Sequence, residues 1–158
     1  YFDEALVEDW ENMIDTNIKG LLYVSKAVLP AMINSKKGHI FNIGSISGKE
    51  VYEKGNVYCG TKHAVNALSK AMRIDLLKHR IKVTAIHPGA AETEFSNVRF
   101  KGNNAQADSV YAGYEPLVAD DIADIVHYCA SLPQRVVVND LVVTALAQAN
   151  SFYLFREE

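Results

Sequence analysis

The sequence is poor in cysteine and has no excess of positive charge. Cys59 and Cys129 are its two cysteines, which suits a reducing compartment and gives no metal-ligand spacing. The net charge of −3 provides no basic surface, so we do not expect nucleic acid as a partner. No apolar run reaches membrane-spanning length and no sorting signal is visible, so we expect a cytoplasmic protein without a membrane partner.

The start of the sequence also lacks the signals that commonly open a protein chain. The 158 residues open with Tyr-Phe-Asp-Glu-Ala-Leu-Val, which contains neither an initiator methionine nor a secretory signal. The length and the ordinary share of apolar residues fit one globular domain. We therefore expect residues 1–158 to form a single, truncated domain.

Apolar periodicity predicts alternating helices and short strands. Ile14, Ile18 and Leu21 recur at helical spacing, Asp9 is the expected N-cap of that helix, and Pro30 predicts a kink within it. The predicted helices cover residues 8–36, 57–79 and 119–132, and the predicted strands cover 39–44, 81–86 and 136–144, most clearly 140–144.

This alternation predicts an α/β fold with a parallel sheet covered on both faces. Three strands between two very long helices would make a poor domain, which again favours a fragment. Residues 90–118 show no sustained periodicity. A loop of this length commonly has a task, such as covering an active site.

Three polar side chains form the most informative pattern. Tyr58 and Lys62 are four residues apart, so they share one face of the predicted helix 57–79. A cation beside a phenol lowers the pKa of the phenol and makes it a better proton donor and acceptor at neutral pH. Ser45 follows the predicted strand 39–44, at the sheet edge where open α/β folds bind ligands.

Other interpretations of these residues stay open. A Tyr-x-x-x-Lys pair alone is better explained by a solvated helix face. Ser45 as a nucleophile lacks an evident His–Asp pair. We expect His63 and Cys59 to be structural. His87 has no nearby acidic or cysteine partner in the sequence, so we expect no metal site there.

Taken together, these motifs resemble the short-chain dehydrogenase/reductase family over residues 8–144. The resemblance implies the C-terminal part of a Rossmann-like, doubly wound parallel sheet. By this resemblance Ser45 orients the substrate, Tyr58 is the acid/base, and Lys62 lowers the Tyr58 pKa and binds the nicotinamide ribose. Asn17 would hold a relay water. The Pro88-Gly89 turn together with Thr93 would contact the cofactor.

A narrower resemblance lies in the segment from Thr93 to Gly102. It is similar to NADP-dependent 3-hydroxy acid dehydrogenases that act on serine and related compounds. This implies a small hydroxy acid as substrate, with Arg99 as a bidentate partner of its carboxylate. A surface arginine in a mobile loop is an equally weighted alternative.

The front half of the family pattern is absent from the sequence. No Gly-rich strand–turn–helix is present to hold a pyrophosphate, and no residue remains that would select NADP over NAD. We therefore expect the 158 residues alone to bind either cofactor weakly. A non-catalytic assembly module with relic catalytic residues is the alternative. The family resemblance implies a homodimer or homotetramer formed through helices 8–36 and 57–79.

Overall fold

A parallel three-stranded sheet lies at the centre of the computed structural model, which describes residues 1–100 and 102–157. The strands are β1 (Gly38–Ile43), β2 (Ile81–Pro88) and β5 (Asp140–Val143), in the order β1-β2-β5. In this register Gly38 pairs with Ile81 and Ala85 pairs with Asp140. The predicted parallel α/β fold is confirmed. Of the predicted strand 136–144, only Asp140–Val143 forms a strand.

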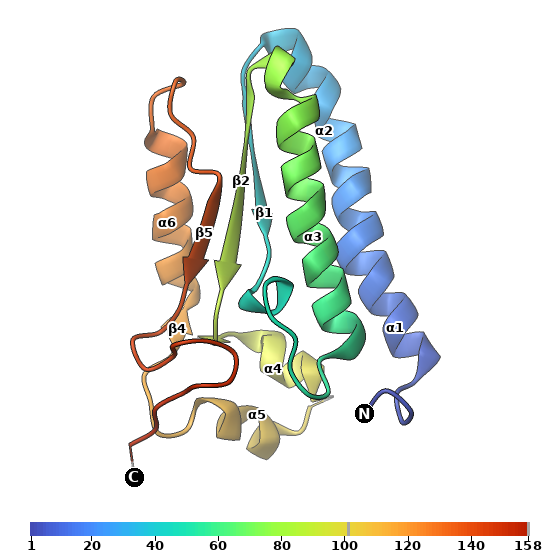
Figure 1. Cartoon of the computed structure of the whole chain (residues 1–158), viewed down its shortest axis with the longest axis vertical. Helices are drawn as coiled ribbons and strands as arrows, with labels where there is room; N and C mark the ends of the chain where they lie inside the picture. The colour runs from blue at the N-terminus through green and yellow to red at the C-terminus, as the bar shows by residue number, and fades with distance from the viewer. Residues whose placement is uncertain (101, 158) are drawn as a thin grey trace.

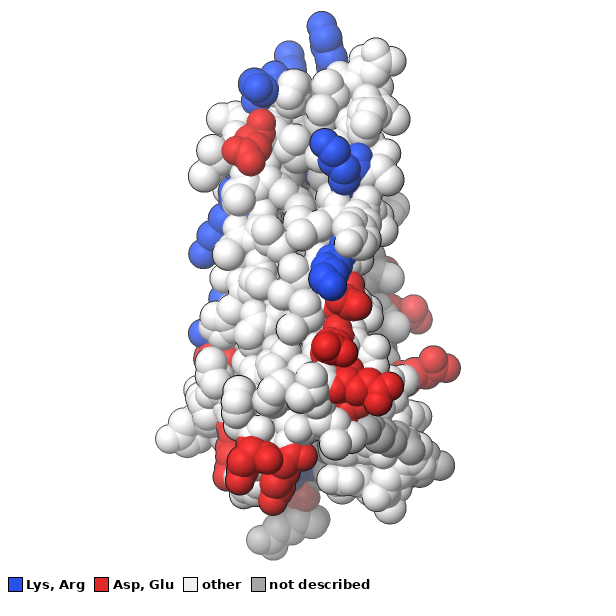
Figure 2. Space-filling model, turned by 90° about the vertical axis from the view of Figure 1, so that its right-hand side faces the viewer, with Lys and Arg blue, Asp and Glu red and all other residues white. Residues whose placement is uncertain are grey.

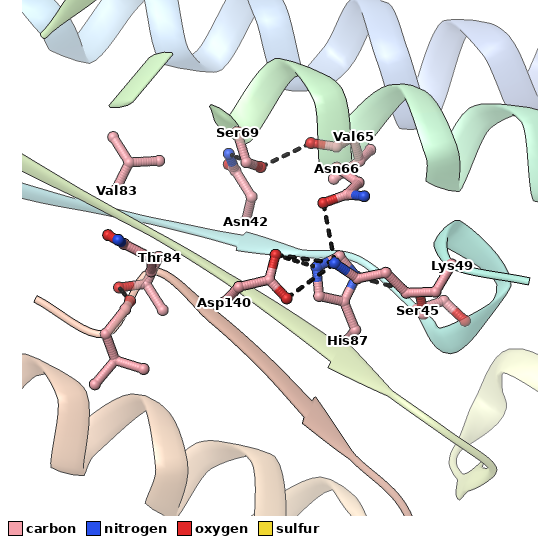
Figure 3. A network of polar contacts seen from close by, with 12 residues as sticks. Asn42, Ser45, Lys49, Val65, Asn66, Ser69, Val83, Thr84, His87 and Asp140 are labelled. Atoms are coloured by element: carbon pink, nitrogen blue, oxygen red, sulfur yellow. Dashed lines mark hydrogen bonds and ion pairs between the residues drawn. The ribbon is translucent and has the colours of Figure 1, made fainter. Parts of the chain in front are cut away.

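Helices cover both faces of the sheet (Figures 1 and 3). α2 (Leu21–Ser35) and α3 (Asn56–Asp75) lie on one face, and α6 (Ala119–Ser131) lies on the other. α3 continues into a short 3-10 turn at Leu77–His79. Within the part of the chain that the structure describes, no helix is both long enough and apolar enough to cross a membrane.

The predicted helix 8–36 consists of three helical segments. α1 (Val7–Ile14) leads into a π-helix, η1 (Asp15–Gly20), and η1 leads into α2. The helix starts two residues before the predicted N-cap, so Asp9 lies in its first turn and Leu6 is the N-cap. α2 passes through Pro30 as one element, so the irregularity lies at η1 and not at the proline.

The hydrophobic core lies between the sheet and the α2–α3 pair. Ile40, Leu76, Ile81 and Val83 form a buried cluster, and Val83 is completely inaccessible. Partly buried side chains of the two helices pack against this cluster: Leu29, Met32, Ile33 and Met72. The strand β2 is buried along almost its whole length because helices cover both of its faces.

Residues 90–118 are more ordered than the sequence predicts. They contain β3 (Ala91–Glu92), α4 (Glu94–Arg99), α5 (Asn104–Tyr111) and β4 (Leu117–Val118), with β3 and β4 paired in parallel. Tyr111 ties these pieces together, because its hydroxyl donates to the Ala91 carbonyl at 2.8 Å and lies 2.7 Å from Ser96 Oγ. Figure 1 shows α4 and α5 across the C-terminal ends of the strands.

His39 on β1 makes the stability of the fold pH-dependent. Burial, followed by the charge of Lys82, lowers the pKa of His39 to about 4. The unfolded chain, with an ordinary histidine pKa near 6.5, binds this proton first as the pH falls. The contribution of His39 to stability is therefore fully present above about pH 6.5 and is lost progressively as the pH falls to about 4.

We expect the free energy of unfolding, measured by urea titration, to be lower at pH 5 than at pH 7. His39→Gln should reduce that difference. It should not abolish it, because burial also lowers the pKa of His87. An unchanged pH dependence in the variant would contradict the role given to His39.

Candidate active site

Ser45 lies in a tight turn directly after β1. Its hydroxyl accepts a hydrogen bond from the Ser47 backbone at 3.1 Å and donates to Ser47 Oγ at 3.0 Å, which caps the 3-10 turn η2 (Ile46–Gly48). Both serines are buried. A Cβ atom on Gly48 would lie 2.5 Å from the Lys62 carbonyl oxygen, so the missing side chain allows the turn to pack directly on α3. Local hydrogen bonds and this close approach fix the position of Ser45.

Tyr58 and Lys62 occupy the first turns of α3 and face the Ser45 turn. Lys62 Nζ donates to the Ile43 carbonyl at 3.2 Å and lies 5.8 Å from the centre of the Tyr58 ring. Burial raises the pKa of Tyr58, and the nearby Ser45 hydroxyl and the charge of Arg99 act in the opposite direction. Burial also lowers the pKa of Lys62.

The expected lowering of the Tyr58 pKa by Lys62 does not appear in this arrangement. Desolvation of the phenol is the largest effect and disfavours the phenolate. The ammonium of Lys62 is engaged by the Ile43 carbonyl. The phenol is therefore in its neutral, proton-donating form at neutral pH.

Asn17 connects the helical segment formed by α1, η1 and α2 to α3. Its side chain donates to Thr61 Oγ1 at 3.1 Å, and the Thr61 hydroxyl donates to the Tyr58 carbonyl at 2.8 Å. Asn17 lies in the π-helix η1, a geometry that is frequent at functional sites. It also lines a groove beside β1 together with Ile43 and Lys62. The structure thus brings Asn17 to the Tyr58–Lys62 pair, and the relay water remains a prediction.

The remaining predicted residues follow β2 at the same edge of the sheet. Pro88 ends the strand, and the Gly89 amide donates to the Val143 carbonyl at 2.7 Å. Thr93 is the N-cap of α4, since its hydroxyl accepts from the Phe95 amide at 3.2 Å. The Phe95 ring then lies 5.5 Å from the Tyr58 ring, which places α4 against the acid/base.

Arg99, in the last turn of α4, is exposed and close to Tyr58. Its guanidinium lies 5.8 Å from the Tyr52 ring and 5.3 Å from the Phe100 ring, and its charge acts to lower the Tyr58 pKa. Lys101, the next basic residue of the predicted substrate segment, lies outside the described residues. The structure therefore brings Arg99 into electrostatic reach of the candidate acid/base.

The half-buried His63 and the buried Cys59 make contacts that fit a structural interpretation. His63 Nδ1 lies 2.9 Å from the Cys59 carbonyl one helical turn earlier, and Cys59 and Cys129 are buried free thiols. In residues 1–100 and 102–157, no three His, Cys, Asp or Glu side chains gather as metal ligands would.

His87 is the residue that sequence reasoning undervalues. It is completely buried beside the Ser45 turn, with Nδ1 3.2 Å from the Ser45 carbonyl and Nε2 3.5 Å from Asp140 Oδ2. Asp140 lies far along the chain from His87, so local spacing gives no signal of this pair. Parallel pairing of β2 and β5 brings the two residues together.

Comparison with known proteins agrees with this geometry. The profile of the short chain dehydrogenase family matches residues 1–104. The NADP-dependent 3-hydroxy acid dehydrogenase YdfG of Escherichia coli K12 is 45% identical over 147 residues, covering 92% of this chain and 59% of that protein. A protein described as an NADP-dependent 3-hydroxy acid dehydrogenase from Schizosaccharomyces pombe is 38% identical over 152 residues, covering 96% and 59%.

A solved structure supports the same assignment. The closed form of a serine dehydrogenase complexed with NADP+ superposes with a TM-score of 0.92 at 42% identity, covering 99% of this chain and 63% of that one. This chain thus spans about 59% of the length of the curated relatives it matches. The matched profile and the shared fold show that the chain belongs to the short chain dehydrogenase family.

Proposed function

We propose that this chain is part of a single catalytic domain that oxidises the hydroxyl of a small 3-hydroxy acid with NADP, or with NAD. The convergence of the Ser45 hydroxyl, the Tyr58 phenol and Lys62 at one edge of the sheet carries this proposal. The 45% identity to a 3-hydroxy acid dehydrogenase supports the substrate class and favours NADP as the cofactor. The free thiols of Cys59 and Cys129 suit a cytoplasmic enzyme.

In the proposed reaction each residue has a separate task. The Ser45 hydroxyl binds the substrate oxygen, and its own position is fixed by Ser47. The deprotonated Tyr58 phenol takes the proton of the substrate hydroxyl during oxidation and returns it to the carbonyl oxygen during reduction. The raised pKa of Tyr58 favours its protonated form, which is the form needed for reduction. Lys62 would favour the phenolate if its ammonium approached the phenol more closely.

The residues present fit the nicotinamide end of the cofactor. Lys62 offers an ammonium 5.8 Å from the centre of the Tyr58 ring, and Pro88, Gly89 and Thr93 lie in the segment that joins β2 to α4 at the same edge. When bound, the nicotinamide supplies the acceptor for the hydride that leaves the substrate carbon. These 158 residues contain no Gly-rich phosphate-binding motif, so they supply this end of the binding surface alone.

A direct assay tests the proposed function. The full-length enzyme should reduce NADP+ in the presence of serine or another 3-hydroxy acid, monitored by absorbance of the reduced nicotinamide. A simple alcohol of the same size should be oxidised much more slowly. Equal rates on acids and simple alcohols would overturn the substrate class, and no cofactor reduction by any hydroxy compound would overturn the proposal as a whole.

Arg99 should determine the preference for a carboxylate substrate. Arg99→Met is expected to raise KM for a 3-hydroxy acid by at least tenfold, because a charge-assisted bidentate contact contributes about 1.5–3 kcal/mol. Its kcat/KM for an uncharged alcohol should change little. Arg99→Lys keeps the charge but not the planar fork and should give an intermediate KM. An equal effect of Arg99→Met on both substrates would exclude a specific carboxylate contact.

We further propose that the protein forms a homodimer or homotetramer through the helices at 8–36 and 57–79. α2 exposes several large apolar side chains: Leu22, Tyr23, Val24 and Val28. The face shown in Figure 2 has an uncharged area at its centre, with Lys and Arg above and beside it and Asp and Glu beside and below it. Sedimentation velocity should detect a species of two or four chains, and Val24→Glu should shift it to the monomer. A wild-type monomer at micromolar concentration would contradict the assignment.

A further inference from the structure

A polar network around the buried His87 lies next to the Ser45 turn, and the proposed reaction does not use it. It contains His87 on β2, Asp140 on β5, Lys49 after η2 and Asn66 on α3 (Figure 3). Two sheet strands, the Ser45 turn and the helix that carries Tyr58 meet in this network. Any group that connects these elements can set the distance between Ser45 and Tyr58.

His87 contacts the backbone of Ser45 directly. Its side chain is completely buried, and Nδ1 lies 3.2 Å from the Ser45 carbonyl oxygen, so Nδ1–H is the donor in this bond. The neighbouring Gly44 makes the approach possible, because a Cβ atom there would lie 2.4 Å from Nδ1. A glycine before the serine and a histidine on the next strand therefore form a matched pair.

Lys49 holds the other end of the same turn. Its ammonium lies 2.9 Å from both oxygens of Asp140 and 3.2 Å from Asn66 Oδ1. His87 Nε2 faces the same carboxylate at 3.5 Å, and it has no hydrogen bond to any described residue. The turn is thus tied to β2 at Ser45, to β5 at Lys49, and to α3 through Asn66.

We propose that His87, Asp140 and Lys49 form a clamp that positions Ser45 for the substrate oxygen. His87 acts through the Ser45 carbonyl, and the Lys49–Asp140 pair fixes the exit of the turn. His87 is a positioning residue, since its contacts are with the Ser45 backbone and with Asp140. This inference rests on the proposed role of Ser45.

The charges around His87 determine the protonation state in which its imidazole can hold Ser45. Asp140 faces it from β5, Lys49 reaches the same carboxylate from the turn, and Lys70 of α3 acts on Asp140 at longer range. Burial, followed by the charge of Lys49, lowers the pKa of His87 and outweighs the opposite effect of Asp140, so the imidazole stays neutral. A neutral imidazole with the proton on Nδ1 satisfies the Ser45 carbonyl.

Two substitutions of His87 separate positioning from packing. In His87→Asn the side-chain amide nitrogen takes the place of Nδ1 and can still donate to Ser45. In His87→Gln the amide nitrogen takes the place of Nε2 and faces Asp140, although the glutamine volume is closer to that of histidine. In the full-length enzyme, His87→Asn should retain most of kcat/KM, and His87→Gln should lose on the order of tenfold, mainly in kcat. A higher kcat/KM for His87→Gln than for His87→Asn would show that packing alone matters and would overturn the clamp.

Nuclear magnetic resonance tests the clamp without any activity. Long-range ¹⁵N spectra of the folded chain should show the Nδ1–H tautomer of His87, and Asp140→Asn should accelerate hydrogen exchange of the Gly48 and Lys49 amides. The Nε2–H tautomer, or unchanged exchange in Asp140→Asn, would overturn the clamp even if the enzyme is active. The expected spectra together with no hydroxy acid oxidation would refute the proposed function and leave the clamp intact.

Discussion

Tyr58→Phe is expected to abolish turnover while leaving the fold unchanged. The substitution removes only the phenolic oxygen, which interacts with the Ser45 hydroxyl, and Ser45 keeps its hydrogen bonds with Ser47. Loss of a general acid/base costs about 10²–10⁴-fold in rate. The measurement is kcat for 3-hydroxy acid oxidation by the full-length enzyme, together with the thermal unfolding midpoint.

Tyr128→Phe provides the matched control for this prediction. Tyr128 lies exposed on α6, so its hydroxyl can be removed without touching the site. This variant should keep wild-type turnover. Tyr58→Phe with more than a tenth of wild-type kcat would refute the role assigned to the phenol, and a large fall in its unfolding midpoint would show that the loss of rate has a structural cause.

Gly48→Ala should damage both stability and activity. The added Cβ atom would lie 2.5 Å from the carbonyl oxygen and 2.9 Å from the carbonyl carbon of Lys62, and these backbone atoms cannot rotate away. Overpacking of this kind costs about 1–3 kcal/mol of unfolding free energy. Relief of the contact moves the Ser45 turn away from α3, so kcat/KM should fall by on the order of tenfold or more.

Gly60→Ala is the control for this substitution. Gly60 lies within α3, and a Cβ atom there would meet nothing within 4 Å. Alanine in a helix interior is more favourable than glycine by about 0.5–1 kcal/mol, so this variant should be more stable than wild type. Urea unfolding of both variants measures the contrast. Equal stability of Gly48→Ala and Gly60→Ala would show that the turn does not pack on α3 as described.

Long elements with strong patterns could be predicted from the sequence. The apolar runs at 39–44 and 81–86 and the face of helix 57–79 gave strand and helix positions close to those observed. The helices α4 and α5 could not be predicted, because they are short and depend on tertiary contacts. The Tyr111 hydroxyl bonds to Ala91 and Ser96, and the Arg156 guanidinium bonds to the Val110 and Ala112 carbonyls. Such contacts leave no local periodicity.

The candidate site also has a part that could be predicted from the sequence and a part that could not. Ser45, Tyr58 and Lys62 were recognisable because their mutual spacing is short and has a chemical meaning. The connection of Lys49 to Asp140 spans 91 residues and exists only once β2 and β5 have paired. The pKa of Tyr58 depends on how deeply α4 and the Ser45 turn bury it, which no spacing reveals.

The π-helix η1 changes the rotational phase of the arm that contains it. One residue more per turn rotates the following side chains by about 100° relative to those before it. α1 can therefore direct its inner face to α3 while α2 directs a different face to β1. Removing one residue from 15–20 would restore a regular helix and preserve composition almost entirely. The inner faces of α1 and α2 could then no longer pack against α3 and β1 at the same time. Asn17 would turn away from Thr61.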